Sequence, residues 1–416
     1  MRFTKPKKAI GIDIGTHSVK AVQMSRVRGA LRVEEVGYAI VDRNQVNMDP
    51  VAAHVEALRE AIRGMSVNQA LLVGALPGQT AVIRYPRLPD MPLSAVPDAI
   101  EAEAGQNIPY DLSEVFLDSY PLETVTEGEE RMLRVLLVAA KEDVVMSRVQ
   151  IADAAGVQYG VLTVDSLALA DAAESCGFLR PDESVALIDI GLTSSSIHFT
   201  RDGISNFIRD VSWGSREFIQ AIAKTRHCEY EEAEAALAQL GEETQTEPGF
   251  GELEAPSLAE EPAPGGEELE TLETPPLSSY ESPLDPLAEE MGDLERGPGA
   301  LPVMKVAADG EGRDLVEVLR GAFGRLISEV RRSFDYYEHQ LYERPVERLI
   351  LCGGVAHLNV VRDTLAEELG VEQVETADPL RSALQFSENS SVELLRERPA
   401  QYMVAVGLAA RGMAEL

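Results

Sequence analysis

Short apolar runs alternate along this chain with longer segments in which apolar side chains recur three and four positions apart. The runs at 9–15, 70–76 and 184–190 have the length and the β-branched content of buried strands. From Leu315 to Leu341 the apolar positions follow helical spacing, which predicts one long amphipathic helix. The alternation of the two patterns predicts an α/β protein.

The same criteria predict the remaining elements. Further strands are expected over 18–25, 31–41, 81–85, 115–122, 132–140, 161–165, 195–200, 204–211 and 348–352. Further helices are expected over 51–63, 93–106, 141–155, 166–175, 215–224, 230–240, 360–369 and 402–412. A turn at Pro77 and Gly78 precedes a compact α/β module over 80–160. The elements on either side of this module belong together, so we interpret it as a subdomain inserted into a larger domain.

The composition is that of a globular chain rather than a membrane or disulfide-stabilised one. Its 416 residues are 45% hydrophobic, and their number suggests roughly two or three domains. No run approaches the roughly 18 consecutive apolar residues of a membrane span, and no signal-peptide pattern follows the basic N-terminus. Three scattered cysteines, Cys176, Cys228 and Cys352, indicate neither a disulfide framework nor a zinc site. We therefore expect a reducing, cytoplasmic location.

The charge is strongly negative and unevenly distributed. A net charge of −33 argues against nonspecific binding to nucleic acid or to anionic lipid. Residues 241–300 hold 17 acidic residues, one basic residue and nine of the 23 prolines, without periodicity. Such a segment buries too little apolar surface to offset its ordering entropy. We predict that 241–302 is a disordered acidic insertion that folding does not need; a solvated spacer and a partner-binding tail are both open interpretations.

One motif occurs twice. The sequence from Ile10 to Ser18 (IGIDIGTHS) is echoed from Leu187 to Ser195 (LIDIGLTSS), and each copy has an apolar strand, Asp-Ile-Gly and then hydroxyl residues. The two aspartates, Asp13 and Asp189, are too far apart for a solenoid repeat. The arrangement predicts two related lobes that face each other.

The residue types in these turns suit a magnesium-bound phosphate. Gly15 and Gly191 allow a tight turn that brings backbone N–H groups close to an anion. The hydroxyls of Thr16, Ser18, Thr193 and Ser194 can donate to phosphate oxygens, and Lys20 adds a positive charge. Asp13 and Asp189 suit Mg²⁺, which takes one or two carboxylates and keeps several waters. One such turn alone would be interpreted as an ordinary hairpin, but two favour the phosphate site.

A third element runs from a predicted strand through Gly353 and Gly354 to Val355 and a helix. A turn of this kind leaves room for a ligand to pack on backbone. The alternative is an ordinary glycine-rich connection between strand and helix.

Taken in order, these elements resemble the actin superfamily. The segments 164–168 and 404–409 resemble its two connecting helices, and the module at 80–160 is similar to the extra, SHS2-type subdomain of FtsA and PilM. The chain resembles most the PilM family of type IV pilus assembly proteins, through four groups of residues: Ala75 to Gly78; Glu101 to Glu103 with Ile108 to Tyr110; Ala139 to Lys141; and Arg209 to Val211. The resemblance covers nearly the whole chain except about 241–302.

The resemblance implies an actin-like fold of two ribonuclease H-like halves. The first nucleotide-binding lobe would comprise 1–79, 161–180 and 380–416. The second would comprise 181–240 and 303–379, with 80–160 as the partner-binding subdomain.

The resemblance also implies binding of ATP and Mg²⁺, with Asp13 and Asp189 reaching the metal through water. The implied nucleotide contacts are Asp13, Gly15, Thr16, His17, Ser18, Lys20, Asp189, Gly191, Thr193, Ser194, Ser195, Gly214, Glu234, Gly353, Gly354 and Val355. Val355 stands where the family's adenosine motif has a third glycine, and Leu237 where its ribose-contacting helix has lysine. No Gln or Glu in the first connecting segment can orient an attacking water, so the catalytic residues are unknown and we expect at most a slow ATPase.

The implied partner is the cytoplasmic N-terminal peptide of PilN, held in a groove between the first lobe and the inserted module. Other pilus platform proteins and cytoplasmic motor ATPases are further implied partners, and twitching motility is the implied process. The protein would sit at the inner face of the inner membrane through these partners; homo-oligomer formation is left open. The alternatives are a nucleotide-free scaffold similar to the cytoplasmic part of the type II secretion protein L, and a sugar kinase of the same superfamily.

Overall fold

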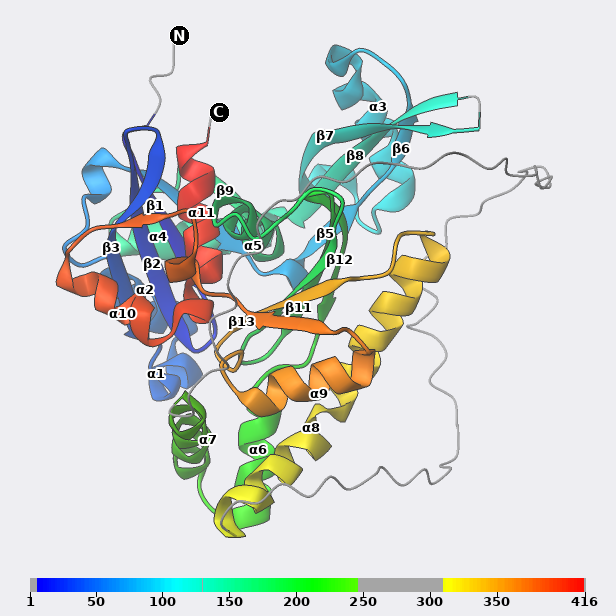
Figure 1. Ribbon diagram of the computed structural model, residues 1–416. Coiled ribbons are helices and arrows are strands. Elements are labelled where there is room, and N and C mark those ends of the chain that lie inside the picture. Colours follow the sequence, from blue (N-terminus) through cyan, green and yellow to red (C-terminus); the bar gives the residue numbers. More distant parts are fainter. Residues whose placement is uncertain (1–5, 129, 246–309, 415–416) are drawn as a thin grey trace. The chain divides into compact units, whose positions relative to one another are not determined.

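Two β-sheets with the same strand order form the centre of the protein (Figure 1). The computed structural model describes residues 6–128, 130–245 and 310–414. The first sheet has the order β15-β3-β2-β1-β4-β9: β15 (Gln385–Phe386), β3 (Ala30–Ile40), β2 (Ser18–Val27), β1 (Lys8–Ile14), β4 (Leu71–Leu76) and β9 (Val161–Val164). The second has the order β12-β11-β10-β13-β14: β12 (Ile204–Val211), β11 (Ser195–Arg201), β10 (Ser184–Ile190), β13 (Arg348–Gly353) and β14 (Gln373–Thr376).

The two sheets also match in strand direction. In each, three strands that are consecutive in the chain pair antiparallel, and the first of them pairs parallel with a strand from later in the chain. A fourth pairing, β4 with β9 or β13 with β14, is again parallel. The repeated motif of the sequence therefore marks two halves of one topology.

The apolar runs of β1 and β10 arise because both faces of each sheet are covered. Along β1, Ile10, Ile12 and Ile14 pack with α2 (Pro50–Ala61) and with the end of α4 (Glu142–Ala155). Gly11 points the other way, toward α11 (Met403–Met413). Because side chains alternate along a strand, Asp13 shares the face of Gly11.

Helices α5 (Asp165–Ser175) and α11 lie against each other on that second face of the first sheet. Ten of the eleven residues of α11 are buried. A Cβ added to Gly11 would lie 2.2 Å from the carbonyl oxygen of Ala405, and one added to Gly407 would lie 1.7 Å from that of Ala168. Glycine at both positions allows backbone to touch backbone. Arg411 also donates to Asp171 at 2.6 Å across the two helices.

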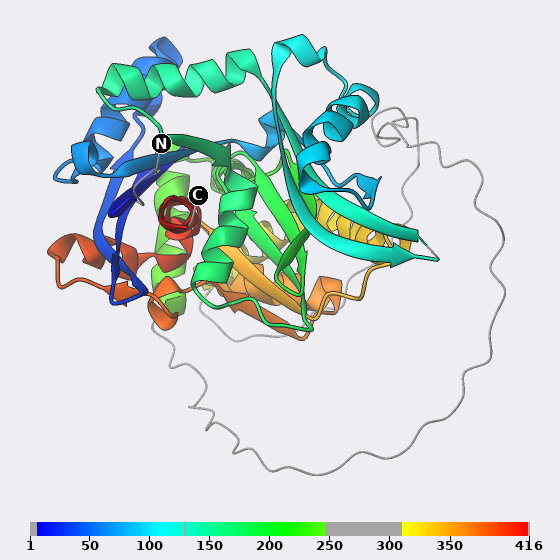
Figure 2. The same cartoon turned by 90° about the horizontal axis from the view of Figure 1, so that it is seen from above.

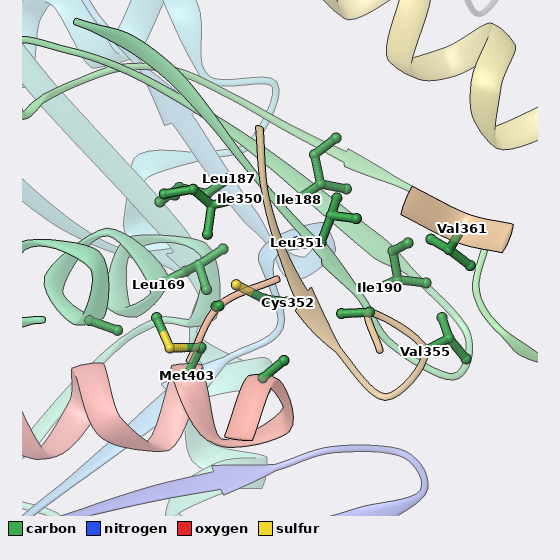
Figure 3. Packing of buried hydrophobic residues seen from close by; sticks show 14 of the residues in the cluster. Leu169, Leu187, Ile188, Ile190, Ile350, Leu351, Cys352, Val355, Val361 and Met403 are labelled. Atoms are coloured by element: carbon green, nitrogen blue, oxygen red, sulfur yellow. The ribbon is translucent and has the colours of Figure 1, made fainter. Parts of the chain in front are cut away.

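The second sheet is covered by α5 and by the helices of its own half. In Figure 3, Ile188 and Ile190 of β10 lie on the same side of the sheet as Leu351 of β13, Cys352 lies on the other side near Met403, and Val355 is in the loop that follows β13. The other helices of this half are α6 (Arg216–Arg226), α7 (Tyr230–Gln245), α8 (Gly310–Asp335) and α9 (Asn359–Leu369). The long amphipathic helix expected over 315–341 is α8 followed by a π-helical turn, Tyr336–Gln340.

The segment after β4 forms a third sheet, which carries a helix of its own (Figure 2). Its strands are β5 (Ala81–Arg84), β6 (Arg87–Pro89), β7 (Val115–Glu127) and β8 (Glu130–Lys141), and α3 (Val96–Asn107) packs on one face. On the other face, Leu136 and Val138 pack with Leu167 of α5 and Ile208 of β12. This inserted module, 80–160 in the sequence analysis, therefore touches both halves.

Sequence patterns did not predict several short elements. These include α1 (Arg43–Met48), α10 (Glu393–Glu397), β6, β14 and β15. The acidic segment predicted to be disordered lies outside the described residues from 246 to its end, and α7 continues to Gln245. None of the helices in the described ranges is long and apolar enough to cross a membrane.

The backbone contact between α5 and α11 predicts a large stability difference between two similar substitutions. Gly407→Ala should lower the free energy of unfolding by on the order of 3 kcal/mol, because the added methyl group forces the helices apart. Gly321→Ala is the control: it lies on the exposed side of α8 with nothing within 4 Å of its Cβ. Helix propensity should make that change neutral or stabilising by about 0.5–1 kcal/mol. Chemical denaturation of both variants measures the difference, and equal stabilities would contradict the contact.

Candidate functional site

The two Asp-Ile-Gly hairpins open onto one cavity of about 1210 Å³. Fourteen of the sixteen residues predicted to bind nucleotide line it: Asp13, Gly15, Thr16, His17, Ser18, Lys20, Asp189, Gly191, Thr193, Ser194, Glu234, Gly353, Gly354 and Val355. The structure thus brings together positions that are up to 342 residues apart in the chain, from Asp13 to Val355.

The two hairpins are built alike. The N–H of Gly15 donates to the carbonyl of Ser18 at 3.1 Å, and the N–H of Gly191 donates to that of Ser194 at 2.9 Å. A Cβ added to Gly15 would lie 3.1 Å from the carbonyl oxygen of Ser18, and one added to Gly191 would lie 2.9 Å from that of Ser194. At the tips, the hydroxyl oxygens of Thr16 and Thr193 are 3.2 Å apart. One small anion can therefore be reached by hydroxyl groups from both halves.

Two of the predicted residues, Ser195 and Gly214, do not line the cavity. The Ser195 hydroxyl is buried and donates to the carbonyl of Trp213 at 2.8 Å, so it is already used within the second half. Gly214 packs against the backbone of the second hairpin, where an added Cβ would lie 2.4 Å from the carbonyl oxygen of Leu192. Both residues support the hairpin from behind.

Four carboxyl groups gather at the inner end of the cavity: Asp13, Asp165, Asp189 and Asp210. Burial, followed by repulsion from Asp13, raises the pKa of Asp189 to about 6. Burial also raises the pKa of Asp210 to about 6. For Asp165, burial together with the charges of Asp210 and Asp189 raises the pKa well above its ordinary value. The group is a concentration of negative charge that a bound cation would relieve.

Two cations lie among these carboxylates, and the first is Lys20. Its Nζ donates to Oδ2 of Asp13 at 3.0 Å. Burial alone would lower the Lys20 pKa, but attraction to Asp13 outweighs burial and the pKa is raised. The second cation, Arg148 of α4, donates from Nη2 to the carbonyl of Ile14 at 3.2 Å.

These residues fit a magnesium-bound phosphate. Burial disfavours the charged forms of Asp165, Asp189 and Asp210, and a bound divalent ion would relieve this. The described ranges contain no group of three or more His, Cys, Asp or Glu side chains that could hold a metal ion, so Mg²⁺ here would need water and phosphate as further ligands. The Ser196 hydroxyl lines the cavity, stands opposite Asp189 in the β10–β11 pair and interacts with the Asp210 carboxyl group, where it partly offsets the effect of burial on the Asp210 pKa.

The wider end of the cavity is crossed by contacts between the two halves. Arg43 of α1 donates to Glu231 at 3.2 Å and to Glu234 at 3.0 Å, and its guanidinium lies 3.9 Å from the centre of the Tyr230 ring. His17 is 3.6 Å from Glu234. Burial lowers the His17 pKa although Glu234 raises it. Glu234, predicted to contact a ribose, is therefore already paired with the first half.

The glycine pair after β13 forms the third wall. Gly353 has a φ of +94°, and a Cβ there would lie 2.3 Å from the carbonyl oxygen of Ile190. Only glycine satisfies both conditions. Val355, at the third position, is 5% exposed, so most of its side chain packs into the core rather than into the cavity.

The start of α5, which carries Asp165, is held by a buried chain of hydrogen bonds. The Ser166 carbonyl can only accept, so Nδ1 of His198, at 2.8 Å, carries the proton. Burial lowers the His198 pKa to about 4, so the ring is neutral and Nε2 accepts from the Ser205 hydroxyl at 2.8 Å. That hydroxyl lies 2.7 Å from the Tyr85 hydroxyl of the inserted module. The chain joins the module, the second half and α5.

Five residues that line the cavity were not predicted from the sequence: Asp165, Asp210, Ser196, Arg43 and Arg148. Asp165 and Asp210 stood in two segments on which the resemblance rested, 164–168 and 209–211, and this was a usable signal. Ser196 could have been found from the repeat, because it stands opposite Asp189 as Lys20 stands opposite Asp13. The two arginines carry no local pattern.

Comparisons with known proteins give a consistent result. The family model described as "Type IV pilus assembly protein PilM" matches residues 11–247 and 312–413. A solved structure, the "PilM-PilN type IV pilus biogenesis complex", aligns with a TM-score of 0.70 at 22% identity and covers 98% of this chain and 99% of that one. The ethanolamine utilization protein EutJ from Carboxydothermus hydrogenoformans aligns with a TM-score of 0.47 at 12% identity, covering 98% of this chain and 90% of that one. MreB 5 of Spiroplasma citri, bound to AMPPNP, aligns with a TM-score of 0.46 at 11% identity, covering 97% and 95%. The expected actin-like fold is confirmed.

The raised pKa of Asp189 predicts a pH-dependent effect of Asp189→Asn. Between the unfolded pKa of 3.8 and the folded pKa of about 6, the folded protein binds the proton more tightly. The contribution of protonated Asp189 to the stability of the fold is therefore fully present below the unfolded pKa and is lost as the pH rises through the folded pKa. At pH 7.5 the variant, which carries no charge, should be more stable than the wild type by on the order of 2 kcal/mol, and at pH 5 by about half as much.

Thermal unfolding at the two pH values measures this difference. Asp363→Asn, an exposed position on α9, is the control and should change the melting temperature at neither pH. A gain for Asp189→Asn that is equal at both pH values would show that it does not come from the buried charge.

Proposed function

Because this chain belongs to the family of the type IV pilus assembly protein PilM, we propose that it binds ATP and Mg²⁺ at the inner face of the inner membrane and captures the cytoplasmic N-terminal peptide of a PilN partner. It would act there as part of the pilus assembly platform. Attachment to the membrane would come from the partner.

The observation that carries the nucleotide site is the convergence of two like hairpins on one cavity. The hydroxyls of Thr16 and Thr193, 3.2 Å apart, can donate to the same phosphate group. Asp13 and Asp189 face the same space and would hold Mg²⁺ through water. The magnesium ion of a bound nucleotide would bring positive charge close to the carboxylates. The nucleotide itself would bring a phosphate that both hairpins can hold.

Nucleotide binding would join the two halves. Thr16 and Lys20 belong to the first, and Thr193 and Asp189 to the second, so a ligand held by both favours one relative position of the lobes. A ligand shifts such an equilibrium only by its difference in affinity for the two states, and contacts from both sides provide that difference. The inserted module packs on both halves and would respond to the shift.

We propose that hydrolysis is slow. A general base must accept a proton from the attacking water. Asp165 is the carboxyl group at the start of the first connecting helix, and its raised pKa favours the protonated form, which cannot accept that proton. The protein would therefore act mainly through the shape that bound ATP gives it.

The partner proposal rests on two supports. The fold is similar to that of the PilM-PilN complex over 98% of this chain. The chain also carries an inserted module joined to the first half through α4, which packs on α2. We propose that an extended peptide binds between these parts.

Isothermal titration with ATP and Mg²⁺ tests the nucleotide site. The wild type should bind, and Asp13→Ala and Asp189→Ala should each weaken binding by about tenfold or more, because a lost metal contact costs at least about 1.4 kcal/mol. Asp363→Ala on the exposed face of α9 is the control. No binding by the wild type would favour the nucleotide-free scaffold. Unchanged affinity in both variants would place the nucleotide elsewhere.

A second titration tests the partner. A synthetic peptide with the cytoplasmic N-terminal sequence of PilN from the same genome should bind the wild type, and its affinity should differ between Mg-ATP and Mg-free buffer. Asp189→Ala should bind the peptide but lose this difference, since it retains the module and loses the metal contact. A scrambled peptide is the control. Equal binding of both peptides would contradict specific capture.

A further inference from the structure

Arg148 places a guanidinium group in the cavity from an unexpected direction. It belongs to α4, which follows directly on β8 of the inserted module, and its side chain lines the cavity beside the first hairpin. Nη2 donates to the carbonyl of Ile14, the residue before the Gly15 turn, at 3.2 Å. Burial lowers the Arg148 pKa, but a guanidinium stays protonated in proteins. The cavity therefore contains a permanent positive charge that the phosphate motifs do not include.

This charge has no carboxylate partner in the part of the chain that the structure describes. A guanidinium has five N–H donors, and a single hydrogen bond, to Ile14, is made here. Asp13 and Asp165 are close enough to raise its pKa, yet neither forms an ion pair with it. Other little-exposed arginines are paired: Arg134 with Glu123 at 3.0 Å, and Arg348 with Glu183 at 2.6 Å.

A partly buried guanidinium without an anion is energetically costly. Lys20, the other cation at the inner end, is already paired with Asp13 at 3.0 Å. Arg148 is therefore the cation there that still has donors available to an incoming anion. Its fork of N–H groups matches two oxygens of one phosphate, which is the geometry that arginine binds best.

We propose that Arg148 binds the terminal phosphate of a nucleoside triphosphate in this cavity and makes the protein prefer the triphosphate to the diphosphate. The proposal rests on the nucleotide site proposed above. The position of Arg148 favours contact with the terminal phosphate. Arg148 donates to Ile14, the residue before the turn of the first hairpin, and at the tip of this hairpin the hydroxyl of Thr16 faces that of Thr193.

The test is a titration of the full chain with Mg-ATP and, separately, with Mg-ADP. The wild type should bind Mg-ATP more tightly than Mg-ADP. Arg148→Gln should lose about tenfold in affinity for Mg-ATP and less than about twofold for Mg-ADP, because a charge-assisted bidentate contact to the third phosphate is removed. Arg148→Lys keeps the positive charge but not the forked N–H groups, so its affinity for Mg-ATP should lie between those of the wild type and Arg148→Gln.

Arg362→Gln is the matched control, since it removes one arginine charge on α9 at a position that does not line the cavity. It should leave both affinities unchanged. The melting temperature of each variant checks that it is folded. If Arg148→Gln does not fold, the Mg-ATP affinity of Arg148→Lys and the difference between the wild-type affinities for Mg-ATP and Mg-ADP still test the proposal.

Three results would overturn the proposal. They are equal wild-type affinities for Mg-ATP and Mg-ADP, unchanged Mg-ATP affinity in Arg148→Gln or Arg148→Lys, and an equal loss for both nucleotides, which would show a general structural role. Binding of neither nucleotide by the wild type would overturn the proposed nucleotide site as well, whereas the first three outcomes leave that site standing.

Discussion

The burial of several carboxyl groups at the meeting point of the two hairpins is the constraint around which this structure is arranged. Burial raises the pKa of Asp165, Asp189 and Asp210, and repulsion from neighbouring carboxylates raises it further for Asp165 and Asp189. Such a cluster persists only where the surrounding fold holds it. The backbone contacts of Gly11 and Gly407 hold part of it, since they fix β1, α11 and α5 against one another and so set the positions of Asp13 and Asp165. The energy stored at the site favours a ligand that brings positive charge.

Each part of the protein reaches this site by its own route. The first half provides Asp13 and Lys20, and the second provides Asp189 across the gap. The inserted module reaches it directly through Arg148 of α4, which lines the cavity, and indirectly from Tyr85 through Ser205 and His198 to the start of α5. Because every donor in that chain has one acceptor, a shift of the module leaves a buried polar group unpaired, which costs about 1–3 kcal/mol. A physical link between the module and Asp165 is thus built into the fold.

The opposite end of the cavity has a different character. Arg43, Glu231 and Glu234 form ion pairs that are partly exposed, and exposed pairs contribute little to stability. Replacing these ion pairs by contacts with a ligand therefore costs little free energy, whereas the buried carboxyl groups at the inner end are held in place by the fold. The site therefore combines a fixed, charged inner end with an adaptable outer end, which suits a ligand with a phosphate end and a larger, more neutral remainder.

The long elements and the two hairpins could be predicted from local sequence patterns. Apolar spacing and glycine turns depend on residues close together in the chain, so β1, β10, α8 and their limits could be predicted to within a few residues. The internal repeat further predicted that the halves share one topology, and the matching strand orders of the two sheets confirm it. Short elements such as α1 and β15 were missed because they owe their form to neighbours rather than to their own pattern.

Which charged residues meet depends on the packing of segments that are distant in the chain. Asp13 lies beside Arg148 because α4 packs on α2, and Arg43 pairs with Glu234 across 191 positions of the chain. Ser195, predicted to contact the nucleotide, instead donates its hydroxyl to the carbonyl of Trp213, because alternate residues of a strand face opposite sides of the sheet. Charge and side-chain direction at a site depend on how distant segments pack. No local pattern in the sequence encodes that packing.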